Sequence, residues 1–225
     1  MPHLVMMQRR VTSFAAALTI LMLSMVVSIR AFADPPVQDP TATVKAVIDQ
    51  AIAVFEDQGI APGAREQRLR SIAENRFDFV GMARSAIGYH WREFTPDQRQ
   101  EFVPLFTSFI EDVYLDRMEQ YSVEKIQQNI KTSLVQFTRQ RMDGPDDAEV
   151  FSLVTLQSRN DPVQVNYLLS LDDGQWKIYD ITVDSISVIA NYRNQFNRVL
   201  NQGGYDRLVS IMREKQKALS ESLAQ

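Results

Sequence analysis

Few side chains in this 225-residue sequence could carry out acid–base or metal chemistry, and histidine occurs only twice. His3 lies in an apolar N-terminal segment, so His90 is the single histidine of the remaining chain, and there is no cysteine. A zinc site built from His and Cys is therefore nearly excluded, and a Ser-His-Asp arrangement would need His90 as its base. Because His90 follows an expected helix end between Tyr89 and Trp91, we interpret it as a packed or capping residue.

Paired acidic residues offer a second possible chemistry, as metal ligands or as an acid–base couple. Asp146-Asp147 and Asp172-Asp173 lie at turn signals, where Asp is favoured because it bonds nearby backbone, and neither pair has the spacing of a calcium loop. Asp180 falls on an apolar strand face and needs a partner, which we expect to be Tyr167 or Arg193. We therefore predict structural roles for these acids, no catalytic residue and no metal site.

An arginine-rich stretch could instead recognise an anion. Its five arginines outnumber the nearby acidic residues by two, in a chain that is acidic as a whole. Such a patch could contact phosphate headgroups or an acidic partner, whereas a solvated helix face is the simpler interpretation. The arginines are Arg65, Arg68, Arg70, Arg76 and Arg84.

The first 33 residues have the features of a cleaved secretory signal peptide. Arg9 and Arg10 precede an apolar run over residues 11–29, which ends in the small-residue pattern Ala31-Phe32-Ala33. Cleavage there would leave 192 residues with a net charge of −7, against −4 for the whole chain. This acidic balance argues against a nucleic-acid partner. An uncleaved anchor over residues 1–33, in a structural or adaptor protein, is the alternative.

The composition of residues 34–41 predicts a proline-rich spacer. We expect residues 42–225 to form a single domain, with its helical part over residues 42–121. Apolar residues at helical spacing predict a helix over residues 44–55, a second from Ala64 and a third over residues 78–86.

The strongest start signal for a helix is Thr95-Pro96-Asp97-Gln98, which forms a capping box with proline at the first helical position. We expect Pro104 to kink the helix that follows, because proline removes one backbone hydrogen bond. One side of this helix is broadly apolar and should form a wall of a core; it includes Phe102, Phe106, Phe109 and Val113.

From residue 122 onward the apolar period changes to that of strands, and we expect a sheet over residues 122–184. Asp173-Gly174 suits a two-residue type I′ turn, which would place Leu169 opposite Ile178 and Tyr167 opposite Asp180. Helices over residues 186–223, broken at Gly203-Gly204, complete an α+β chain. The expected strands are residues 123–130, 133–141, 149–157, 163–171 and 175–183.

A series of short motifs then runs along the chain from about residue 45 to 215. They are Phe77-Asp78-Phe79 with Met82-Ala83, Ile87-Gly88-Tyr89-His90-Trp91, the stretch from Thr95 to Phe102 leading to Phe106 and Tyr114, Gly174 to Ile181, Ile186-Ser187-Val188, and Asn191-Tyr192-Arg193-Asn194-Gln195-Phe196. In this order they resemble the MlaC family, also known as the toluene-tolerance auxiliary proteins, which are periplasmic phospholipid carriers. Ser185, where the family often has glycine, and Pro104 depart from the family pattern, and neither change removes a ligand residue.

This resemblance implies a fold and a function. The fold would be a curved antiparallel sheet of about four to five strands packed against several helices, with a lipid cavity between them. The protein would bind phospholipid acyl chains in the periplasm and hydrolyse nothing. It would shuttle lipid between an outer-membrane lipoprotein complex and an inner-membrane ABC transporter with its substrate-binding membrane subunit, maintaining the lipid asymmetry of the outer membrane.

Sheet parity and the apolar helix side together predict which residues line such a cavity. No cofactor is expected beyond the phospholipid cargo. The predicted lining residues are Phe102, Phe106, Phe109 and Val113 from the helix, and Val165, Tyr167, Leu169, Trp176 and Ile178 from the sheet.

Two alternatives concern the ligand and the chemistry. A hopanoid-associated branch resembles the same family, so the lipid could be a hopanoid. A small exported enzyme on a sheet-and-helix fold would use Asp180, Tyr167 and His90, and it requires that these three side chains converge in one polar pocket.

Overall fold

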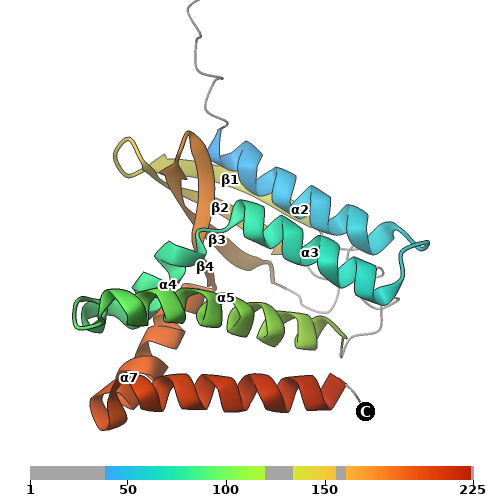
Figure 1. Cartoon of the computed structure of the whole chain (residues 1–225). Helices are drawn as coiled ribbons and strands as arrows, with labels where there is room; N and C mark the ends of the chain where they lie inside the picture. Colours follow the sequence, from blue (N-terminus) through green and yellow to red (C-terminus); the bar gives the residue numbers. More distant parts are fainter. Residues whose placement is uncertain (1–38, 120–133, 156–160, 224–225) are drawn as a thin grey trace, which may run out of the picture. The chain divides into compact units, whose positions relative to one another are not determined.

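The fold was obtained as a computed structural model that describes residues 39–119, 134–155 and 161–223. The described residues form helices followed by an antiparallel sheet and a final helix, so the predicted α+β class is confirmed (Figure 1). The signal peptide predicted over residues 1–33 and the strand predicted over residues 123–130 lie outside the described residues. In the ranges the structure describes, no helix has both the length and the apolar character needed to cross a membrane.

The helices begin close to the predicted capping residues. The Asp78 carboxylate accepts a hydrogen bond from the Gly81 backbone N–H at 2.7 Å. Thr95 and Gln98 form the expected capping box, at 2.9 and 3.2 Å. The helical elements are α2 Pro40–Glu56, α3 Pro62–Arg76, α4 Phe79–Ile87, the 3₁₀ turn η1 Gly88–Arg92, α5 Pro96–Glu119 and α7 Val188–Leu223.

Gly204 and Pro104 lie within long helices, and they affect those helices differently. Gly204 has φ 68° and breaks α7 into two helices, as the glycine pair predicts. Helix α5 continues through Pro104 as one element.

In the part of the chain that the structure describes, five antiparallel strands form the sheet, in the order β1-β2-β3-β4-β5. The short last strand is absent from the sequence-based expectation, because two residues carry no alternation signal. The strands are β1 Leu134–Met142, β2 Asp147–Thr155, β3 Val163–Asp172, β4 Gln175–Val183 and β5 Ile186–Ser187.

The β3–β4 hairpin follows the predicted register only in part. Asp173 and Gly174 have positive φ angles of 47° and 75°, which the type I′ turn requires, and Leu169 faces Ile178 as expected. Beyond this pair the register shifts by one residue, so Tyr167 faces Ile181 rather than Asp180. The bulge moves Asp180 off the apolar face, because a one-residue shift exchanges the faces of a strand.

A second irregularity lies in β1, the outer strand of the described sheet. The pairing with β2 shifts between Phe137 and Arg139. Arg139 places its guanidinium 3.6 Å from the centroid of the Phe151 ring. Most described residues of β1 are exposed.

The buried apolar residues form two groups, which we call the helical cluster and the sheet cluster. The helical cluster is made by α4, α5, α7 and the Phe94 loop. The sheet cluster is made by Val44 of α2 with the face of β2, β3 and β4 that α2 covers; Phe77 packs partly against both groups. The helical cluster comprises Met82, Ala83, Ala86, Ile87, Phe94, Phe102, Phe106, Phe109, Ile110, Val113, Ile189, Phe196, Leu200, Leu208 and Met212. The sheet cluster comprises Val44, Ala148, Val150, Tyr167, Leu169, Trp176 and Ile178.

Candidate functional site

The sheet cluster brings together the five sheet residues that the sequence predicts as cavity lining. Tyr167, Leu169, Trp176 and Ile178 are buried in it, and Val165 packs against it while remaining partly exposed. They share one face because alternate residues of a strand point to the same side, and the bulge in β4 lies beyond Ile178. Sequence reasoning missed Ala148 and Val150 of β2, although their alternation along the strand is a usable signal.

Burial on this side of the sheet is incomplete. No described side chain of α3 is buried, although this helix carries Leu69, Ile72 and Ala73. Val47 and Ile48 of α2 are only partly buried where they contact the sheet cluster. On the sheet itself, Phe137, Val165, Leu171 and Ile181 are also partly exposed. The centre of this apolar face is therefore buried, while its margin stays partly exposed. Helices α2 and α3 lie over the sheet (Figure 1).

A cleft of about 380 Å³ opens beside this face. Most of its lining is polar, and none of the nine predicted lining residues belongs to it. The sequence did not predict these lining residues. They come from three separate elements, so their spacing along the chain carries no sign that they meet in a cleft. The lining residues are Gln50 of α2, Ser71, Ile72, Asn75 and Arg76 of α3, and Gln175 of β4.

The four predicted lining residues from the long helix lie elsewhere. Phe102, Phe106, Phe109 and Val113 are buried in the helical cluster, where they contact α4 and α7 rather than the sheet cluster. The Phe106 ring lies 5.8 Å from Phe102 and 6.3 Å from Phe196, between ring centroids. The structure thus divides the predicted lining into two sets that do not meet.

Tyr167 is the one titratable side chain buried in the sheet cluster. Burial raises the pKa of its hydroxyl, and hydrogen bonding with Ser152 lowers it in part. The Ser152 hydroxyl also donates to the Val165 carbonyl at 2.8 Å. This pair keeps the buried hydroxyls satisfied, so the face stays apolar in character.

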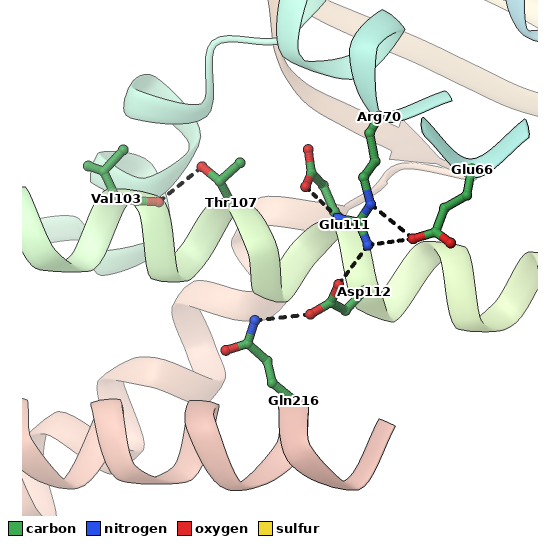
Figure 2. Close-up of polar contacts among 7 residues, drawn as sticks. All are labelled: Glu66, Arg70, Val103, Thr107, Glu111, Asp112 and Gln216. Carbon is green, nitrogen blue, oxygen red and sulfur yellow. Dashed lines mark hydrogen bonds and ion pairs between the residues drawn. The ribbon is translucent and has the colours of Figure 1, made fainter. Parts of the chain in front are cut away.

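An ion-pair network fastens α3 to α5 (Figure 2). The Arg70 guanidinium contacts Glu66 at 2.9 Å, Glu111 at 2.7 Å and Asp112 at 2.9 Å. Burial lowers the pKa of Arg70, but these hydrogen bonds outweigh it and the net direction is upward. Burial raises the pKa of the Glu111 carboxyl, which the hydrogen bond and the charge of Arg70 lower in part. Arg70 is therefore fully engaged within the protein.

The three residues that an enzyme would need occupy separate settings. The Nδ1 atom of His90, in η1, lies 2.5 Å from a carboxylate oxygen of Glu93, the residue that follows η1. The centroids of the His90 and Tyr89 rings are 3.9 Å apart. Asp180 accepts hydrogen bonds from the Ser187 hydroxyl at 2.5 Å and from the Ile189 backbone N–H at 3.1 Å.

Asp180 therefore has a structural role, as predicted, but neither predicted partner is its actual one. The register shift turns Asp180 away from Tyr167, and it stabilises the start of α7 instead. The Arg193 guanidinium donates to the Ser85 carbonyl at 2.6 Å. The described side chains thus offer no shared pocket for His90, Tyr167 and Asp180.

The chain was compared with known families and structures. A family model described as "MlaC protein" matches residues 43–214. A solved phospholipid-binding protein from Ralstonia solanacearum, in complex with a phospholipid, superposes with a TM-score of 0.64 and 26% sequence identity. The match covers 81% of this chain and 99% of that chain. No curated protein matches the sequence.

Proposed function

The chain belongs to the MlaC family, as the match over residues 43–214 shows, and from this premise we propose that it is a phospholipid carrier. The observation that carries the proposal is the similarity to a phospholipid-binding protein solved with its lipid, over nearly all of that protein's length. The partly exposed margin of the sheet cluster supports it, because acyl chains need an apolar surface that the protein's own side chains do not fill.

The physical demand on such a carrier is large. Burying one methylene is worth about 0.8 kcal/mol, so two acyl chains of roughly fifteen methylenes each represent on the order of 20 kcal/mol of gross burial. Only a deep apolar slot can offset that exposure to water, whereas the polar headgroup can stay hydrated. The function therefore needs an apolar cavity and requires no catalytic group.

We place the acyl chains between the sheet cluster and the α2–α3 layer. The cleft of about 380 Å³ beside this layer is lined mostly by polar residues, so it does not supply the apolar space that acyl chains need. A two-chain lipid thus requires α2 and α3 to move apart from the sheet. No described side chain of α3 is buried, so displacing α3 loses little apolar packing. Displacing α2 exposes Val44, and displacing α3 from α5 breaks the ion pairs of Arg70 with Glu111 and Asp112.

The location and the partners form the finer part of the proposal. The features of a signal peptide over residues 1–33 support export to the periplasm. Family membership supports exchange of lipid between an outer-membrane lipoprotein complex and an inner-membrane ABC transporter, with maintenance of outer-membrane lipid asymmetry as the result.

Lipid analysis of the native protein tests the proposal. The exported protein is purified from its own cell without detergent, and bound lipid is extracted and identified by mass spectrometry. We expect about one phospholipid per chain, and the purified protein should take up phospholipid from vesicles. If a hopanoid is found instead, the ligand is a different lipid class and the carrier function stands. If the protein carries no bound lipid and takes up none from vesicles, the carrier function itself is contradicted.

A further inference from the structure

The cleft between α2, α3 and β4 has a lining with one positive charge and no carboxylate. Arg76 supplies the charge, and the side chains of Gln50, Ser71, Asn75 and Gln175 supply further hydrogen-bonding groups. Ile72 is the single apolar member of this lining. A concave surface with a guanidinium and several amide and hydroxyl groups matches an anion with several oxygen acceptors.

Among the described residues, Arg76 is the one arginine of α3 whose guanidinium has neither a carboxylate nor a carbonyl partner. Arg65 donates to the Ile60 carbonyl at 3.3 Å, Arg68 lies 3.6 Å from Asp57, and Arg70 contacts three carboxylates. Within residues 39–119, 134–155 and 161–223, no carboxylate lies within ion-pair distance of Arg76. Its residue is nevertheless only partly exposed.

Two of the nearby acidic side chains are engaged elsewhere. The Asp78 carboxylate is occupied by the Gly81 N–H at the start of α4. Asp172 pairs with Lys177 at 2.7 Å. Glu74 is exposed, and its charge repels that of Glu111 of α5. An anion in the cleft would therefore meet Arg76 without direct competition from Asp78 or Asp172.

Backbone contacts hold Arg76 at the border of the sheet cluster. The next residue, Phe77, packs against that cluster and forms an isolated bridge with Ile178, and the Asp78 N–H donates to the Ile178 carbonyl at 2.9 Å. Gln175 likewise precedes the buried Trp176. The polar cleft and the apolar face are thus joined through adjacent residues, which suits a ligand with a polar end and an apolar end.

We propose that this cleft binds the phosphate of the phospholipid headgroup, with Arg76 as its cationic ligand. This inference rests on the proposed function and deepens it, since it names the chemical group that the protein recognises. A charge-assisted hydrogen bond of this type changes an affinity by about tenfold or more. Neutral lipids with the same acyl chains would lack that contribution.

The experiment compares Arg76→Gln with Arg84→Gln in the full exported chain. Arg84 is an exposed arginine of α4 outside the cleft, so the two variants change the net charge equally. Delipidated protein is incubated with vesicles doped with phosphatidylglycerol or with diacylglycerol of identical chains, and bound lipid is measured. We expect Arg76→Gln to bind phosphatidylglycerol about tenfold more weakly and diacylglycerol as the wild type does. Arg84→Gln should bind both as the wild type does.

The remaining outcomes contradict either headgroup recognition by Arg76 or the carrier function. If Arg76→Gln weakens both lipids equally, or neither, headgroup recognition by Arg76 is wrong while the carrier function stands. If the wild type takes up neither lipid, the carrier function is wrong. A parallel titration with inorganic phosphate, followed by NMR, separates the two phosphate sources. Tight binding of free phosphate that does not compete with lipid would overturn the assignment to a headgroup.

Discussion

The helical cluster and the sheet cluster are both apolar, but they differ in how their residues are buried. In the helical cluster, Phe102 and Phe106 are fully buried and each packs against Phe196 as well as against the other. In the sheet cluster, buried residues such as Leu169 alternate with partly exposed neighbours such as Val165 and Leu171. Dense ring packing in the helical cluster leaves no space for a ligand. On a partly covered sheet face, a ligand can take the place of the helices that cover it.

We infer from this difference that the helical cluster mainly stabilises the fold, whereas the sheet cluster is available for binding. The long aromatic helix resembles a cavity wall when its sequence is considered alone, because aromatic side chains suit both a core and a lipid. Its partners in α4 and α7 place it in the core. The sheet face, where Val165 and Leu171 remain partly exposed at the margin of the cluster, is the surface that we propose for cargo.

The largest expected effect is a loss of stability from truncation in the helical cluster. Phe106→Ala removes a fully buried ring and should lower the free energy of unfolding by about 3–5 kcal/mol. Val165→Ala in the sheet cluster should cost only about 1 kcal/mol, because that side chain is already partly exposed. Urea denaturation of both variants measures the contrast. Equal losses would show that the two clusters are packed alike.

A smaller effect, on binding, is expected from a polar substitution on the sheet face. Leu171→Asn should lower phospholipid occupancy by about tenfold, because Leu171 borders the sheet cluster. Leu168→Asn is the matched control, since Leu168 lies on the same strand with similar burial but faces the opposite side. Vesicle uptake by the folded variants compares the two. A larger loss in Leu168→Asn would place the cargo on the other face.

The smallest effect concerns the contact between the two regions, through Glu111 of α5 and Arg70 of α3. Burial raises the pKa of Glu111 above its usual 4.5, so the folded protein holds this proton more tightly than the unfolded chain does. The stability from this group is present below pH 4.5 and is lost as pH rises through the folded pKa.

Denaturation across this pH range, for the wild type and Glu111→Gln, measures that contribution. The wild type should lose stability relative to Glu111→Gln as pH rises from below 4.5 to neutral. The opposite slope would mean that attraction to Arg70 outweighs burial. Lipid uptake should be unchanged in Glu111→Gln, since Arg70 keeps Glu66 and Asp112 as partners.

Local signals predicted most of the fold. The capping box at Thr95, the helix end at Gly88 and the turn at Asp173-Gly174 are each decided by a few neighbouring residues, and all three are confirmed. The register beyond Leu169 was not predictable in this way, because a bulge depends on how the strand packs. The consequence for Asp180 was therefore missed.

The sequence predicted which sheet residues share a face, because alternation along β3 and β4 grouped Tyr167, Leu169 and Trp176. It did not predict that Phe102 and its neighbours form a separate cluster, because that depends on which elements α5 contacts. Ion pairs were equally hard to predict from the sequence, since Arg70 finds two of its acidic partners 41 and 42 residues away.

The shifted pairing in β1 also affects how copies of the protein behave toward one another. An outer strand with unpaired backbone groups can template a strand of another copy and so promote aggregation. The bulge between Phe137 and Arg139 twists this strand, and Arg139 places a positive charge on it, whereas Arg141 is paired with Asp143 and Glu149. Two copies that approach through β1 would therefore meet an irregular backbone, which disfavours strand pairing between them.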